Sequence, residues 1–194
     1  MLAGVAQQRM PYRVNTYTDE APPSGFQKQN LFVGGGLQLG FGADQFNIGV
    51  NPEVGYSLAR WLDAGIVVNF DYNSISPDPY YNGDLSSKEF IYGAGIFGRV
   101  YFLPFLFAAV QPEYNWISQN SSYSGSPKQT FNTSVPSLLL GIGYGHRVIG
   151  QTTLYIELMF DVINNVNSPY SDGFGHPLPV IRFGFDIFPN KRNF

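Results

Sequence analysis

The chain has 194 residues, of which 44% are hydrophobic and 13% charged, with 22 Gly, 14 Pro and no Cys. Its aromatic content of 16% excludes an intrinsically disordered chain, and the lack of cysteine excludes a disulfide framework or a cysteine-ligated zinc site. The formal net charge of −3 provides no basic field for nucleic acid, so we expect no nucleic-acid partner.

Residues 1–29 show no strand pattern and are expected to form an N-terminal arm. The segment 1–8 fits either the tail of a signal peptide or an ordinary chain start. Further along, no window reaches the roughly 18 consecutive apolar residues that a membrane-spanning helix needs. The best candidate, 100–110, is too short and contains Pro104. A helical membrane protein is therefore excluded.

From residue 30 onward, apolar and polar residues alternate with the period of a β-strand. Between Gln45 and Leu58 every even position is apolar, whereas the odd positions carry small or polar residues. The same pattern predicts eight strands, at 30–42, 45–58, 62–73, 88–102, 105–117, 133–147, 152–164 and 177–188. Several of these exceed the strand length of about 5–6 residues that is usual in soluble proteins.

The connections between these strands alternate in length. Those at 59–61, 103–104 and 148–151 are tight, whereas 74–87, 118–132 and 165–176 are long and rich in Ser, Asn, Gly, Pro and Tyr. Only the connection at 43–44 breaks this order, because it is short at the long-loop end. Pro52, Pro112 and Pro136 fall within strands, where each removes a ladder donor, and β-bulges are the expected remedy.

The bulky face carries almost no charge, while the polar face is dominated by Gly, Asn and Ser. A soluble barrel would place its apolar face inside, but here the polar face is too small and too sparsely charged for a water-facing surface. We therefore predict an all-β fold, a transmembrane up-and-down antiparallel barrel of eight strands over 30–188, with a tail at 189–194. Aromatic residues would form belts at both membrane interfaces, namely Tyr72, Phe90, Tyr92, Tyr114 and Trp116 at the long-loop end and Tyr56, Trp61, Phe102 and Phe105 at the other.

The charged residues on the polar face are predicted to meet inside the barrel. An eight-stranded barrel is just wide enough for its side chains, so buried charges must pair with each other. The expected interior network consists of Glu53, Arg99, Glu113, Glu157, Arg182 and Asp186. Phe97, Tyr101, Phe107, Tyr155 and Met159 share the same face, which favours a plugged interior over the alternative of a narrow channel.

Some small outer-membrane barrels are enzymes that modify lipid A, and such an enzyme needs a catalytic base. His146 lies near the short-turn end, which leaves His176 in the last long loop as the weak candidate, with Ser168, Ser171 and Asp172 nearby. A lipid A-modifying enzyme using His176 is therefore an alternative to a protein without activity. We expect no catalytic site, metal or cofactor, because a lone histidine with scattered acids is a weak signal.

The segments 52–56 (PEVGY) and 62–72 (LDAGIVVNFDY) resemble the second hairpin of small outer-membrane β-barrel proteins, OmpX-like and OmpA-barrel-like, in the form common in Bacteroidota. The segment 180–188 is similar to their C-terminal assembly signal, carried here by Phe183, Phe185 and Phe188. Either Phe188 or Phe194 serves as its terminal aromatic residue. The resemblance implies insertion into the outer membrane by the barrel-assembly machinery, with both termini, including the arm at 1–29, in the periplasm and the long loops outside.

The leading functional hypothesis is a non-enzymatic barrel with a structural or interaction role, as an adhesin-like protein or a subunit of a larger outer-membrane complex. Contacts would be made through the lipid face or through tyrosines of the loops, since tyrosine is enriched at interfaces. The expected partners are outer-membrane lipid and lipopolysaccharide, an extracellular ligand or another membrane protein. The candidate loop contacts are Tyr80, Tyr81, Tyr123 and Tyr170.

Overall fold

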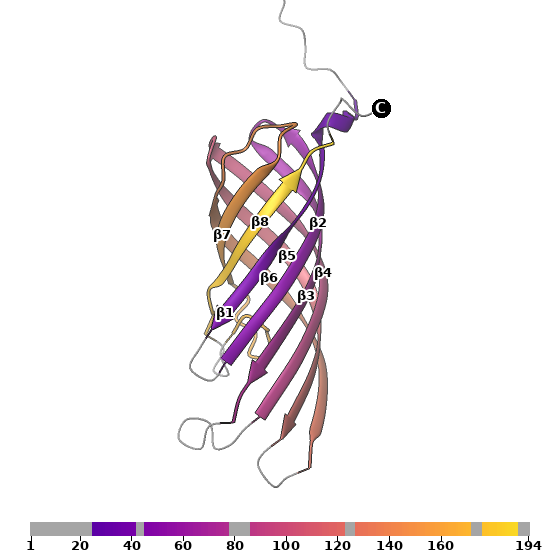
Figure 1. Cartoon of the computed structure of the whole chain (residues 1–194), viewed down its shortest axis with the longest axis vertical. Coiled ribbons are helices and arrows are strands. Elements are labelled where there is room, and N and C mark those ends of the chain that lie inside the picture. The colour runs from indigo at the N-terminus through magenta and orange to yellow at the C-terminus, as the bar shows by residue number, and fades with distance from the viewer. Residues whose placement is uncertain (1–24, 42–44, 78–85, 123–126, 172–175, 190–194) are drawn as a thin grey trace, which may run out of the picture.

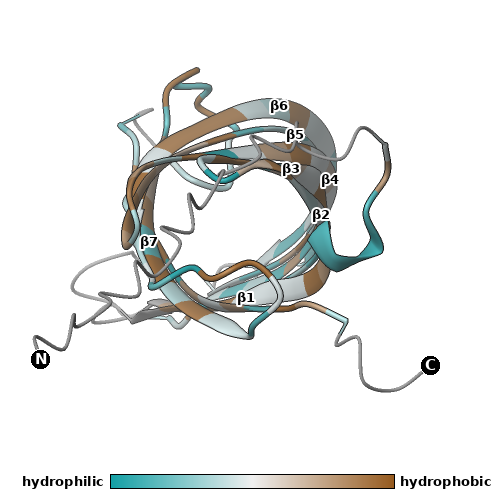
Figure 2. Cartoon of the chain, turned by 90° about the horizontal axis from the view of Figure 1, so that it is seen from above, coloured by the Kyte–Doolittle hydropathy of each residue, from teal (hydrophilic) through white to brown (hydrophobic). Residues whose placement is uncertain are grey.

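A computed structural model of the chain describes residues 25–41, 45–77, 86–122, 127–171 and 176–189. Consecutive strands pair antiparallel, and the first strand pairs with the last, so the sheet closes into an up-and-down barrel (Figure 1). Figure 2 shows the ring of strands end on. The predicted eight-stranded all-β fold is confirmed. The strands are β1 (Leu31–Phe41), β2 (Gln45–Ala59), β3 (Leu62–Ile75), β4 (Ser86–Leu103), β5 (Leu106–Ser122), β6 (Gln129–Tyr144), β7 (Thr153–Asp161) and β8 (Val180–Ile187).

The two faces of the barrel are inverted relative to a soluble protein. Ile66, Ile142 and Leu154 point outward and are 58%, 58% and 74% exposed. Asn69 and Asn115 point inward and are fully buried. An apolar exterior around a closed polar interior is the arrangement that lets strands cross a bilayer, because every backbone group then bonds within the sheet. The fold is therefore that of a transmembrane barrel, as the alternation predicted.

Helical structure in the described residues is limited to η1, a 3-10 turn at Lys28–Asn30. No helix in this part of the chain is long and apolar enough to cross a membrane. Just before η1, the Phe26 ring stacks on Tyr56 with 5.2 Å between the ring centroids, and the Gln27 amide donates to the Tyr56 hydroxyl at 2.8 Å. These contacts hold the chain against the outside of β2 before β1 begins. The first 24 residues of the predicted arm lie outside the described residues.

The strand bounds differ from the predicted ones mainly at the long-loop end. The sequence placed 118–132 in a loop, but β5 and β6 pair as far as Ser121 and Gln129. Ser, Asn, Thr and Gln side chains give little strand signal, yet their backbone groups complete the ladder equally well. By contrast, β7 and β8 are short, and the connection between them extends over 162–179.

The three prolines sit in the sheet without the bulges that were predicted for them. Pairing of β2 with β3 skips Pro52, and pairing of β4 with β5 skips Pro112, but the register is the same on both sides of each gap. The ladder thus loses local bonds and keeps its alignment. Pro136 lies in the part of β6 that has no described partner on the β7 side, where a missing N–H is tolerated.

Glycines make room for the aromatic rings inside the barrel. The Phe107 ring lies over Gly143, its cross-strand partner on β6, and the Tyr155 ring lies over Gly184 on β8. A Cβ atom at either glycine would overlap the ring. The glycine-rich strands therefore permit a packed aromatic interior in a narrow barrel.

Aromatic rings lie on the outside of the barrel near both of its ends. At the long-loop end, the Tyr92 and Trp116 rings stack at 5.7 Å, and Tyr114 meets Trp116 edge-on at 5.2 Å. At the short-turn end, Trp61 is 56% exposed, and Phe105 packs against Tyr144 at 5.8 Å. Amphipathic rings take these positions at the two interfaces of a bilayer.

Candidate functional site

Arg99 is the centre of the polar network inside the barrel. Its guanidinium is 3% exposed and binds Glu53 through two parallel bonds of 2.7 and 2.8 Å. It also donates to the Tyr155 hydroxyl at 2.9 Å and lies 3.4 Å from Asp186 and 3.9 Å from Glu157. Strands β2, β7 and β8 thus contribute partners to one cation on β4. Such a fork, aligned with a carboxylate in a site closed to water, is among the stronger polar contacts in proteins.

The second buried arginine, Arg182 on β8, has weaker partners. It lies 3.1 Å from the Gln111 amide oxygen, 3.4 Å from that of Gln38 and 3.8 Å from Glu157. Its side chain is 2% exposed. Arg182 and Arg99 therefore share Glu157, which links the two halves of the network.

Glu113 joins the predicted network through Gln111, whose amide oxygen accepts from Arg182 and whose amide nitrogen donates to Glu113. Among the described residues no ion pair joins it to either arginine. Its carboxylate instead accepts hydrogen bonds from Asn69 at 2.6 Å, Gln111 at 2.6 Å and Asn115 at 2.7 Å. The amides satisfy the buried charge in place of a cation.

The short-turn end of the barrel is closed by the β6–β7 connection, residues 145–152. Arg147 reaches across the barrel mouth and forms an ion pair with Asp63, with its Nε 2.7 Å from the carboxylate. It also donates to the Arg60 carbonyl at 2.7 Å. Ile149 packs on the cluster of Phe32, Val67, Phe97 and Phe188. This connection, predicted as a tight turn at 148–151, is longer because it covers the end of the interior.

The described parts of the β7–β8 connection, 162–171 and 176–179, cover the long-loop end. Asp161 anchors this segment, because its carboxylate accepts the Ser168 hydroxyl at 2.6 Å and the amides of Leu138 and Ile163 at 3.1 Å each. Tyr170 then turns inward and packs with Met159, Leu139 and Val180. The interior is therefore packed at both ends by its own chain.

Tyr170 was predicted to contact a partner outside the cell, and this prediction is wrong. The side chain is 3% exposed, so an external partner cannot reach it. Burial, with the nearby carboxylates of Glu113 and Asp71, raises the pKa of the Tyr170 hydroxyl well above its usual range. Tyr80, Tyr81 and Tyr123 lie outside the described residues.

Two serines near His176 in the sequence bond to other groups within the described structure. The Ser168 hydroxyl is buried on Asp161, and the Ser171 hydroxyl donates to the carbonyls of Asn165 and Ser168 at 3.0 Å each. Both hydroxyls thus hold the turn of the loop. His176 is exposed, and Asp172 lies outside the described residues. In the described part of the chain, no group of three or more acids and histidines could hold a metal ion.

The residues of the predicted assembly signal occupy both faces of the last strand. Phe183 and Phe185 point outward and are 55% and 43% exposed. Phe188 follows the end of β8 and points inward, with its ring 5.2 Å from that of Phe32. As an even-numbered residue it continues the inward row of Arg182 and Asp186.

Sequence reasoning missed an edge of the sheet at the long-loop end. β5 and β6 extend furthest there (Figure 1), but β7 pairs only with Leu139–Tyr144 of β6. The Leu138 amide and carbonyl bond to Asp161 and Val162, so even-numbered residues of β6 turn their backbone groups to the β7 side. Thr130, Asn132 and Ser134 therefore present backbone groups at a free edge within the described structure. We call these three residues the β6 edge; no apolar alternation marks it in the sequence.

No model of a known protein family and no curated protein sequence matches this chain. Solved structures similar to it include a major outer membrane protein from Thermus thermophilus, with 16% identity and a TM-score of 0.49 over 81% of this chain and 98% of that one. Neisserial surface protein A has 13% identity and a TM-score of 0.46 over 82% and 97%. The attachment invasion locus protein Ail of Yersinia pestis, in complex with the heparin analogue sucrose octasulfate, has 7% identity and a TM-score of 0.45 over 80% and 93%. Because all three scores lie below 0.5, the fold assignment stands on the closed strand register itself.

Proposed function

We propose that the protein is a non-enzymatic outer-membrane barrel that binds an extended polypeptide segment of an extracellular partner along the β6 edge. The observation that carries this proposal is the stretch of β6 from Gln129 to Ser137, which is paired on one side only among the described residues. A free strand edge is a template for another strand, which adds to the sheet through backbone hydrogen bonds.

The orientation of the barrel supports an extracellular position for this edge. An even number of strands brings both termini to one end, and barrels of this class place their short turns in the periplasm and their long loops outside. The β6 edge lies at the long-loop end and begins at Ser134, the cross-strand partner of Trp116 in the aromatic belt. Phe183 and Phe185 on the outside of β8 are available to the barrel-assembly machinery for insertion.

The chemistry of the edge suits a peptide backbone. Proteins usually protect exposed edges with charges or proline. Here the three edge residues carry neutral polar side chains, and the nearest proline, Pro136, lies at the membrane end of the stretch. Nine residues of strand extend over roughly 30 Å at about 3.4 Å each. This length accommodates a partner strand of ordinary size.

The interior supports a role without catalysis or conduction. The network around Arg99 and the two inward-folded connections fill the barrel, and the hydroxyls near His176 are held in structural hydrogen bonds. We therefore place the function on the outside of the barrel.

The test is selection of peptides of about ten residues from a random display library against the protein in mild detergent. Thr130→Pro removes one edge N–H without touching the ladder to β5, and Thr130→Ala is the matched control that keeps this N–H. We expect selected peptides to slow amide exchange at Asn132 and Ser134 and to bind the proline variant at least tenfold more weakly than the alanine variant. Equal binding to both variants would contradict the proposal.

A further inference from the structure

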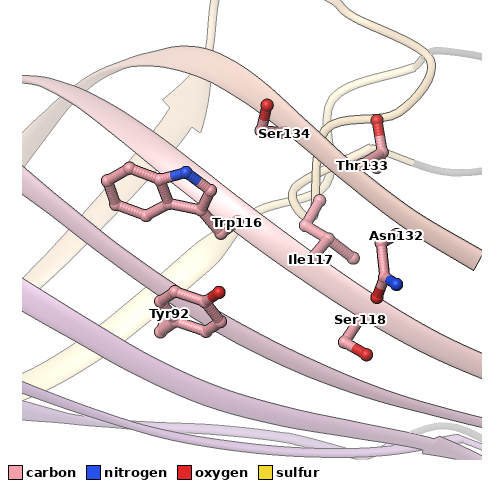
Figure 3. Close-up of a pocket in the computed structure, with 7 residues that line it drawn as sticks. All are labelled: Tyr92, Trp116, Ile117, Ser118, Asn132, Thr133 and Ser134. Carbon is pink, nitrogen blue, oxygen red and sulfur yellow. The ribbon is translucent and has the colours of Figure 1, made fainter.

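The outer wall of β4, β5 and β6 contains a shallow groove with a volume of about 290 Å³. Figure 3 shows the Tyr92 and Trp116 rings on one side of it and Ser118 and Asn132 on the other. Ser134 completes its outer rim. We call this the headgroup groove.

The headgroup groove combines flat rings with free hydrogen-bonding groups. Tyr92 and Trp116 stack nearly parallel, with an interplanar angle of 16°, so they form one continuous aromatic platform. The Ser118 hydroxyl and the Asn132 amide make no hydrogen bond to any residue that the structure describes. They lie in the next row of the sheet, directly paired with each other. No charged side chain lines the groove.

A second groove adjoins the first on its membrane side. It has a volume of about 390 Å³, and its outward-facing walls are almost entirely apolar. Tyr92 lines both grooves, so the two are neighbours on the barrel wall. We call this the chain groove, and its outward-facing residues are Ile48, Val50, Phe70, Tyr72, Phe90 and Tyr92.

The tilt of the strands sets the two grooves at different depths. One row of cross-strand partners runs through Val50, Phe70, Tyr92, Trp116 and Ser134, which makes four steps from β2 to β6. Strands about 4.8 Å apart and tilted by about 40° change depth by roughly 3 Å per step, or roughly 12 Å over this row. The tilt in Figure 1 carries the row toward the long-loop end as it passes to β6. The chain groove therefore lies on the membrane side of the headgroup groove, and both grooves include residues of the aromatic belt at the long-loop end.

We propose that the two grooves form one binding site for a glycolipid of the outer leaflet. A sugar ring has an apolar face of C–H groups, which packs on the Tyr92–Trp116 platform, and a rim of hydroxyls, which bond to Ser118 and Asn132. The acyl chain lies along Phe70 and Tyr72 in the chain groove. This inference rests on the proposed outer-membrane orientation; it uses the side chains of Asn132 and Ser134, whereas the β6 edge uses the backbone groups of the same residues.

The groups that line the site select a saccharide over a phosphate headgroup. Phosphate recognition uses arginine, lysine or clustered backbone N–H groups, and the headgroup groove has no cationic side chain. Serine and asparagine can both donate to and accept from a hydroxyl, as a sugar requires. An uncharged sugar on an acyl chain is thus the ligand that matches both grooves.

The experiment uses the full chain reconstituted in phosphatidylcholine vesicles. The protein has two tryptophans, so Trp61→Phe leaves Trp116 as the single fluorophore. Glucosyl diacylglycerol with brominated acyl chains is compared with phosphatidylcholine and phosphatidylglycerol that carry the same chains, since bromine quenches a tryptophan that it touches. We expect the glycolipid to quench Trp116 at an about tenfold lower mole fraction than either phospholipid.

Two further variants make the result specific. Asn132→Leu in the Trp61→Phe background keeps the reporter and should remove most of the preference. Trp116→Phe leaves Trp61 at the opposite belt as the reporter, which should respond equally to all three lipids. Equal quenching of Trp116 by all lipids, stronger quenching by phosphatidylglycerol, or an unchanged preference in Asn132→Leu would overturn the inference while leaving the proposed function intact. A chain that does not enter the vesicles would overturn the membrane role as well.

Discussion

Replacing Arg99 by Met should destabilise the barrel by about 3–5 kcal/mol, the range for removing one partner of a buried ion pair. Met keeps most of the side-chain volume but leaves the Glu53 carboxylate, 5% exposed, without the two bonds of 2.7 and 2.8 Å that now hold it. Asp186 and the Tyr155 hydroxyl lose the same partner. The stacking of the guanidinium on Phe97 and Tyr155, at 4.6 and 4.4 Å, is lost too.

The double variant Arg99→Met with Glu53→Leu separates two free energies: the cost of leaving the buried Glu53 carboxylate unpaired, and the net contribution of the ion pair to stability. When both partners become apolar, no unpaired carboxylate remains at Glu53, so we expect most of the lost stability to return. Arg60→Met, at an exposed cation on the β2–β3 turn, is the control and should change stability by less than about 0.5 kcal/mol.

The assay is urea unfolding in lipid vesicles, followed by the loss of heat-resistant gel mobility. With an m-value of about 2 kcal/mol per molar urea, the Arg99→Met midpoint should fall by about 2 M. A loss below about 1 kcal/mol would refute the reasoning, because it would mean that water or another group compensates Glu53. A double variant no more stable than Arg99→Met would also refute it.

Four other outcomes are expected. Val50→Arg or Val68→Arg, at outward positions 41% and 38% exposed, should destabilise the barrel by about 2–4 kcal/mol in the same titration, and unchanged midpoints would show the face assignment to be wrong. Tyr170→Ala should lower the free energy of unfolding by about 3–5 kcal/mol, because it leaves a cavity, whereas the same substitution of a surface tyrosine would lower it little. His176→Ala should leave the lipid A mass profile unchanged; an altered profile would support the enzyme alternative. In planar bilayers the native protein should show no steady large conductance, and its appearance would contradict a packed interior.

The sequence by itself determined the two faces of the barrel. In the segment from Gln45 to Leu58 side chains alternate between faces as a direct consequence of strand geometry, so local order is enough to assign Val50 outward and Glu53 inward. The positions of Trp61 and Trp116 in the two belts follow in the same way. The number of strands, the closure of the sheet and the assignment of the apolar face to the outside required no tertiary information, because lipid permits only a closed sheet.

The tertiary structure alone decided which side chains meet. Arg99 and Asp186 are 87 residues apart, and their contact depends on how each strand aligns with the next around the whole ring. Glu113 could have met Arg182 by parity, yet the register gives it three amide donors. The burial of Tyr170 could not be predicted from the sequence either. The connection that carries it has no periodicity, and its inward turn depends on the hydrogen bonds of Asp161 and Ser168. The β6 edge also escaped the sequence, because its polar residues pair through the backbone, and only the shortness of β7 leaves them exposed.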